Sequence, residues 1–170
     1  SFNKNQKNLK SRIAFVHRGL TKYRLPLFKK LFYNSKINFH VFHQYFSSTP
    51  SNVGFSQPKN RDILDYPITR IYSSNIHILF YNYLKLALPS FKLIRSVIRY
   101  NPDIIVIESL SNIGNVLLLT PYILIKKKPF IWWGLGAIPN RKISIRSTIG
   151  DLIQSWYVKR SEYIFSYATY

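Results

Sequence analysis

Short apolar runs recur along the chain and alternate with longer segments that have helical periodicity. Most of these runs contain several β-branched or aromatic residues, and few contain an internal charge. Continuous apolar runs of this kind are typical of parallel strands that are covered on both faces. The runs predicted as strands are 12–17, 37–44, 68–72, 103–109, 129–134 and 162–167.

Between these runs the apolar positions follow the spacing of helices. Helices are predicted over 23–34, 80–98, 113–125 and 144–161, with a kink or restart at Pro89 because proline lacks a backbone N–H. The stripes expected to face the core are Leu27, Phe28, Leu31 and Phe32; Phe80, Leu84, Ala87, Phe91, Ile94 and Ile98; and Ile145, Ile149, Leu152, Ile153 and Trp156.

Strands that alternate with helices predict an α/β fold. The expected architecture is a Rossmann-like open parallel sheet with helices on both faces and right-handed crossovers. With 170 residues the chain is long enough for one such domain, predicted over 12–170 after a disordered basic leader at 1–11.

The charge balance is strongly basic, with 25 Lys and Arg against 6 Asp and Glu, a net charge of +19. Such a surface attracts polyanions, among them anionic lipids, phosphorylated substrates and nucleic acid. Three basic groups lie on the 80–98 helix, at 126–128, and at Arg141, Lys142 and Arg146. Together, with Trp156 and Tyr157 as interfacial anchors, they favour an anionic membrane surface over ordinary solvated faces. There is no cysteine, which excludes disulfides, and the scattered histidines have no metal-ligand spacing, so no metal site is predicted.

Candidate binding residues follow the predicted strands. In open parallel sheets, ligands lie beyond the carboxyl ends of the strands. Glu108 and Ser109 end one such run, and Trp133, Gly134 and Gly136 end the next. Glu108 could accept a hydrogen bond from a substrate hydroxyl or form a structural ion pair with a basic residue, and the sequence leaves both open.

The loop after the first predicted strand is a second candidate. Arg18 and Arg24 could offset the charge of a phosphate, while Gly19 would let the backbone approach a ligand. The alternative is a plain basic turn. His17 and Glu108 are the candidate catalytic groups, although a lone histidine such as His17 or His43 is more often simply hydrogen-bonded.

Several segments resemble family 4 glycosyltransferases, which have the GT-B fold. The segment Tyr23-Arg24-Leu25-Pro26-Leu27-Phe28 is similar to the Tyr-Arg-x-Pro-hydrophobic-Phe sequence that opens their first helix. The resemblance covers 12–170 and only the amino-terminal lobe. Its other segments are Pro102-Asp103-Ile104-Ile105-Val106, Trp132-Trp133-Gly134-Leu135-Gly136 and Arg160-Ser161-Glu162-Tyr163-Ile164.

This resemblance implies retaining transfer of a sugar from a nucleotide-sugar to a glycan or lipid-linked acceptor, with no metal and no further cofactor. The amino-terminal lobe would hold the acceptor through Arg18, Gly19, Tyr23 and Arg24 and the residues at the later strand ends. The implied location is cytoplasmic, peripheral at the inner membrane face of a bacterium. Leu135 stands where many relatives have histidine, which puts an acid/base role at that position in doubt.

The resemblance also implies that the nucleotide-binding lobe, with its paired glutamates, is absent from this chain, so the chain alone should be inactive. One alternative is a non-catalytic membrane-docking half of a split transferase. The other is a basic nucleic-acid-binding module, which we place last because no helix-turn-helix or aromatic-strand signature occurs.

Overall fold

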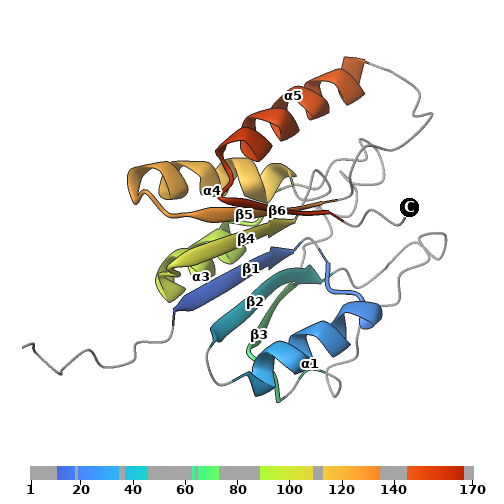
Figure 1. The fold of residues 1–170 in the computed structure, drawn as a ribbon, viewed down its shortest axis with the longest axis vertical. Helices are drawn as coiled ribbons and strands as arrows, with labels where there is room; N and C mark the ends of the chain where they lie inside the picture. Colours follow the sequence, from blue (N-terminus) through green and yellow to red (C-terminus); the bar gives the residue numbers. More distant parts are fainter. Residues whose placement is uncertain are drawn as a thin grey trace, which may run out of the picture.

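The computed structural model confirms the α/β fold (Figure 1). The strands are β1 (Arg12–His17), β2 (Asn38–Tyr45), β3 (Ile68–Tyr72), β4 (Ile104–Glu108), β5 (Phe130–Gly134) and β6 (Tyr163–Ser166). The helices are η1 (Lys22–Arg24), α1 (Leu25–Tyr33), α3 (Phe91–Tyr100), α4 (Ile113–Ile125) and α5 (Ile145–Arg160). The structure describes residues 11–17, 19–34, 37–45, 63, 65–72, 89–108, 113–134 and 145–166.

The strands form one six-stranded sheet in the order β3-β2-β1-β4-β5-β6, and every pairing is parallel. From β1 the chain moves outward to β2 and β3, and from β4 it moves in the opposite direction to β5 and β6. Right-handed crossovers in opposite directions place their helices on opposite faces of the sheet. The strand order therefore reverses between β1 and β4, at the centre of the sheet.

A separate apolar core covers each face of this sheet. On one face α3, α4 and α5 pack over Val16, Ile107 and Trp132, and on the other α1 packs Phe28 against Phe15 and Val106. Figure 1 shows α1 apart from the α4 and α5 pair, with the sheet between them. Because side chains alternate along each strand, even-numbered residues of β1 face one core and odd-numbered residues face the other.

Helix α3 begins at Phe91, next to Pro89, and is closed at both ends. The side chain of Ser90 accepts a hydrogen bond from the backbone N–H of Leu93 (3.3 Å), and Asn101 ends the helix with a φ of 49°. These are ordinary amino- and carboxyl-terminal caps. The predicted restart at the proline agrees with this boundary, whereas the positions from Phe80 to Ala87 lie outside the described residues.

The predicted inward stripe of α3 is wrong in phase. Ile94 is buried, but Phe91 is 73% exposed and Ile98 is 42% exposed. The core is reached instead by Leu93 and Val97. Apolar residues spaced by four and three positions lie on one face of a helix. Whether that face is the buried one depends on the strands and helices that pack against it.

Predictions for the other two amphipathic helices are wrong in part. In α1, Phe28 is buried while Leu27 and Phe32 are exposed, and in α5 Leu152 is 68% exposed. Ile149 of α5 is also exposed, and the side chain of Ile145 lies outside the described residues.

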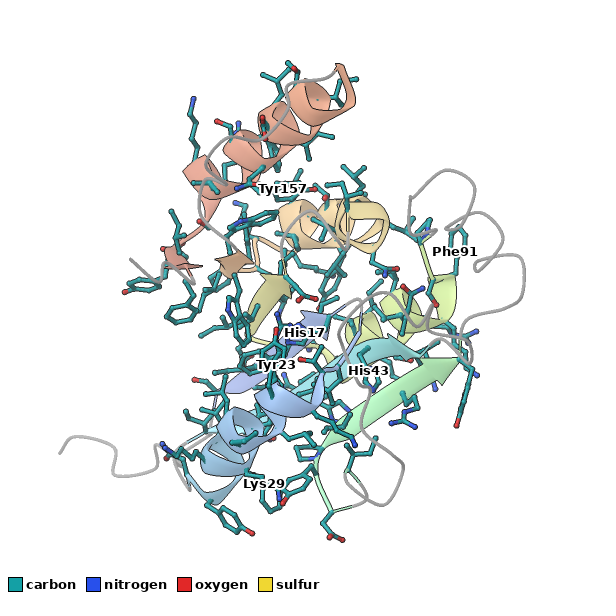
Figure 2. All side chains as sticks on the ribbon, turned by 90° about the vertical axis from the view of Figure 1, so that its right-hand side faces the viewer. His17, Tyr23, Lys29, His43, Phe91 and Tyr157 are labelled. Carbon is teal, nitrogen blue, oxygen red and sulfur yellow. The ribbon has the colours of Figure 1, made fainter. Side chains whose placement is uncertain are left out.

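Tyr157, expected as a membrane anchor, is buried between α4 and the sheet (Figure 2). Its ring stacks on Trp132 at 5.5 Å, and its hydroxyl contacts the hydroxyl of Thr120. The expectation is therefore wrong for Tyr157, because its ring already belongs to the core.

Candidate functional site at the carboxyl edge of the sheet

Charged and aromatic side chains form a row at the carboxyl ends of five strands, on the α1 face of the sheet. The strand registers pair Arg70 with His43, His43 with His17, and Glu108 with Trp133. The register of β1 with β4 pairs Val16 with Ile107, so the next residues along the two strands are His17 and Glu108. The row, named here the edge row, consists of Arg70, His43, His17, Glu108 and Trp133.

Arg24 lies over the centre of the edge row. The backbone N–H of Arg24 bonds to the carbonyl of Thr21, closing the short turn that leads into α1. This turn directs the side chain inward, where only 8% of the residue is exposed. Its Nη1 donates to Oε1 of Glu108 at 2.5 Å, and its guanidinium carbon lies 5.1 Å from the ring centroid of Trp133.

Glu108 is held in its ionised form. Burial alone would raise the pKa of Glu108, but the charge and hydrogen bonds of His17 and Arg24 outweigh burial and lower the pKa to about 2. Nδ1 of His17 lies 3.3 Å from Oε2 of Glu108, and Arg24 bonds to the other oxygen. The ion pair foreseen as one alternative for Glu108 is present with Arg24, and it joins η1 to the end of β4.

His17 has one ring nitrogen in this network and one outside it. Nδ1 lies between Oε2 of Glu108 and Nη1 of Arg24, the latter at 3.1 Å. Because a carboxylate oxygen only accepts, a hydrogen bond to Glu108 needs a proton on Nδ1; an unprotonated Nδ1 would instead accept the second N–H of Nη1. Nε2 is buried and has no hydrogen-bond partner among the described residues, so it presents a lone pair when the ring is neutral with its proton on Nδ1.

His43 presents a second lone pair beside the first. Its Nδ1 lies 3.0 Å from the backbone carbonyl of Gln44 and must donate to it, because a carbonyl cannot donate. Burial, followed by the nearby charges of Arg70 and His17, lowers the pKa of His43 to about 4. His43 is therefore neutral near pH 7, and its buried Nε2, without a partner in the described part of the chain, is an acceptor. Figure 2 shows His17 and His43 on neighbouring strands.

The structure brings together some predicted site residues and leaves others outside the description. His17, Arg24, Glu108 and Trp133 are in contact with one another. Tyr23 is 60% exposed beside them, with the Arg24 guanidinium 5.5 Å from its ring. Arg18, Ser109, Gly136 and the replaced position Leu135 lie outside the described residues.

The two described glycines of the predicted site differ in their surroundings. Gly134 is buried at the end of β5. A Cβ built on Gly19 would meet no atom within 4 Å, and the φ of Gly19 is not positive. Neither backbone strain nor the protein's own packing therefore requires glycine at position 19.

Two polar residues of this edge were not among the sequence predictions. Arg70 occupies the end of the edge row, and its position could have been found from the β2–β3 register, since alternation puts Arg70 on the side opposite Ile71. Asn115 of α4 bonds to Gln44 of β2 at 3.1 Å and to the backbone N–H of Ser90 at 2.6 Å. These bonds fix the amino ends of α3 and α4 at the carboxyl edge, and no local sequence signal marks them.

The edge row offers a paired carboxylate, two imidazole acceptors and an indole ring. The imidazole acceptors can receive hydrogen bonds from hydroxyl groups. No group of three or more His, Asp or Glu side chains that could hold a metal ion occurs in the described ranges. No protein-family model matches the chain, and no curated protein is significantly similar to it.

Proposed function

We propose that this chain is the acceptor-binding lobe of a retaining glycosyltransferase, which transfers a sugar from a nucleotide-sugar to a membrane-associated glycan or lipid-linked acceptor. The observation that carries the proposal is the position of His17 and Glu108. They end β1 and β4, the neighbouring strands between which the strand order reverses. In open α/β sheets this reversal opens a crevice beyond the carboxyl ends, where ligands bind.

In this proposal His17 binds the acceptor hydroxyl. Nδ1 donates to Glu108, which fixes the tautomer and the ring orientation, and Nε2 accepts the hydrogen bond of the hydroxyl. Arg24 keeps Glu108 ionised and so supports this arrangement without meeting the substrate itself. Before transfer the hydroxyl proton points to Nε2 of His17. In a front-face retaining transfer the O–H then turns to the departing phosphate, which takes the proton as the hydroxyl oxygen attacks the anomeric carbon and the bond to the nucleotide phosphate breaks.

The burial of Arg24 changes its predicted role. The sequence suggested that Arg24 would offset phosphate charge, whereas its Nη1 lies against Glu108 and His17. The proposal therefore assigns anion binding in the first loop to Arg18 or to Lys22, which is exposed. The nucleotide-sugar itself is assigned to a second lobe that lies outside this chain.

The first test is saturation-transfer NMR on the 170-residue chain with oligosaccharides and, separately, with nucleotide-sugars. We expect signals from oligosaccharides and none from the nucleotide portion of the donors. His17→Gln should remove the oligosaccharide signals. His40→Gln is the matched control, because His40 bonds to Thr69 at 2.6 Å from the same strand as His43 but outside the edge row.

The second test is transfer by the full-length gene product with labelled nucleotide-sugars and extracted membrane lipids. Transfer that is lost in His17→Gln and kept in His40→Gln supports the proposal. Oligosaccharide binding without transfer from any donor would favour the non-catalytic half of a split transferase. Absence of both binding and transfer would overturn the proposal.

A further inference from the structure

Helix α4 is apolar on the face that points away from the sheet. No charged residue occurs in its thirteen residues, and Val116, Leu119 and Ile123 face the core. Leu117, Leu124 and Ile125 nevertheless have exposed fractions of 48%, 53% and 76%. Residues seven or eight apart lie on one helical stripe, so these side chains form an outward apolar strip. A helix that is apolar all round is usually covered on every side.

Helix α3 continues this surface and adds charge. The Tyr122 hydroxyl bonds to Asn101 at 3.2 Å, and Asn115 bonds to the backbone of Ser90 at 2.6 Å, so α3 and α4 lie side by side along their lengths. Phe91, labelled in Figure 2, is exposed on α3. The exposed cations are Lys92, Arg95 and Arg99 of α3, and Lys126 and Lys127 directly after α4.

Neither α3 nor α4 carries an acidic residue of its own. Neither 90–101 nor 113–129 contains an aspartate or a glutamate. Asp103, beyond the end of α3, interacts with the charge of Lys128, but the two helices themselves place no negative charge beside the aliphatic strip. Apolar side chains beside Lys and Arg are the combination that binds the headgroup region of an anionic bilayer.

We propose that the outer face of α4 and the adjoining cations of α3 form a docking surface for an anionic lipid bilayer. Leu117, Leu124 and Ile125 enter the headgroup region, and Lys126 and Lys127 contact anionic headgroups. The inference deepens the membrane part of the proposed function and rests on it for its biological purpose. It assigns membrane contact to exposed side chains instead of to Tyr157, whose ring is buried.

Other occupants fit this surface less well. A second copy of the chain would bring like charges together, at a net charge of +19 for each copy. Protein interfaces are enriched in aromatic residues and arginine and depleted in lysine. Phe91, Arg95 and Arg99 of α3 fit that composition, whereas the α4 strip itself is Leu and Ile bordered at its end by lysines. Nucleic acid would use the cations and leave the aliphatic strip uncovered.

The experiment is flotation of the purified 170-residue chain with vesicles of phosphatidylcholine alone or mixed with phosphatidylglycerol. We expect binding to the anionic vesicles that weakens as salt is raised, and little binding to the neutral ones. The assay contains no sugar, so its failure is distinguishable from failure of the glycosyltransferase proposal.

Two pairs of variants test the two parts of the surface. Leu124→Gln with Ile125→Gln should weaken partitioning by about tenfold or more, whereas the control pair Ile149→Gln with Leu152→Gln, exposed on α5, should leave it unchanged. Each lysine near an anionic surface strengthens vesicle binding roughly fivefold, so Lys126→Gln with Lys127→Gln should weaken binding by about 25-fold. Its charge-matched control, Lys30→Gln with Lys159→Gln, removes exposed lysines outside the surface and should have a smaller effect.

Three outcomes would overturn the proposal. The first is no binding to anionic vesicles at low salt. The second is equal loss in the surface variants and their controls, which would mean diffuse attraction by the whole basic chain. The third is loss in the lysine pair with no loss in the Leu124 and Ile125 pair, which would mean polyanion binding without insertion. Circular dichroism of every variant checks that the fold is retained.

Discussion

Arg24 and Glu108 are 84 residues apart in the chain, yet Nη1 of Arg24 lies 2.5 Å from Oε1 of Glu108. The pair links η1, which follows β1, to the end of β4. These two strands are the neighbours between which the strand order reverses. The pair also explains structurally why arginine follows Tyr23 in the segment that resembles family 4 glycosyltransferases. That arginine contacts both His17 and Glu108 and holds the carboxylate in place.

Removing one member of this pair should destabilise the fold strongly. Arg24→Met removes the guanidinium partner of the buried carboxylate of Glu108, and the free energy of unfolding should fall by about 3–5 kcal/mol. The double variant Arg24→Met with Glu108→Leu should recover part of this loss, because no uncompensated charge stays buried. Urea unfolding followed by circular dichroism measures all three proteins.

The control for that series is the exposed pair of Arg12 and Asp103. Their side chains are 40% and 47% exposed and lie 3.7 Å apart. Arg12→Gln should therefore cost less than about 1 kcal/mol. A cost for Arg12→Gln equal to that for Arg24→Met would contradict the assignment of the Arg24 pair as the dominant one.

The fold should lose stability on acidification in two successive pH ranges. His43 has a folded-state pKa of about 4, below its ordinary 6.5, so the unfolded chain binds its proton first and stability falls between about pH 6.5 and 4. Glu108 has a folded-state pKa of about 2, below its ordinary 4.5, so its contribution is lost as the pH falls from about 4.5 towards 2. Unfolding free energies between pH 7 and pH 2.5 measure both losses.

Single variants separate the two ranges. His43→Gln should flatten the decline above pH 4, whereas Glu108→Gln should flatten only the decline below pH 4.5 and lower stability at pH 7. If both variants kept the native pH dependence, other groups would be responsible for the acid sensitivity.

Gly19→Ala should leave the fold intact. A Cβ at this position meets nothing within 4 Å, and the backbone there does not have a positive φ. The melting temperature should stay the same or rise slightly. Alanine lowers the conformational entropy of the unfolded chain, which stabilises the fold by about 0.4–1 kcal/mol. A large drop in melting temperature would show that glycine is needed for the fold itself.

The same variant tests the predicted close approach of a ligand. If the open space beside Gly19 receives the acceptor, Gly19→Ala should weaken oligosaccharide binding in the NMR experiment while stability is unchanged. Unchanged binding would remove Gly19 from the site.

Tyr157 should act as a core residue. Tyr157→Ala removes a ring that stacks on Trp132, and we expect the free energy of unfolding to fall by about 3–5 kcal/mol. Tyr157→Phe keeps the ring and loses only the contact with Thr120, at a cost of about 1 kcal/mol. Chemical unfolding measures both, and vesicle flotation of Tyr157→Phe should match the unchanged protein.

The fold could be predicted well because parallel strands have a strong local signature. Each of the six predicted strands occurs within one residue of its expected ends, and α4 has its predicted bounds. Helix orientation was predicted less well. Phe91 and Ile98 satisfy helical spacing but are exposed on α3, because the layer beneath α3 is formed by strands remote in sequence.

The sequence by itself determined which segments are strands and which residues end them, because alternation, β-branching and proline positions act within a few residues. This was enough to place His17 and Glu108 at one edge. Only the tertiary structure decided that Arg24 turns inward, that Arg70 and His43 extend the edge row, and that α4 exposes Leu124 and Ile125. These features depend on strand order and on contacts between residues far apart in the chain, and local patterns carry no information about either.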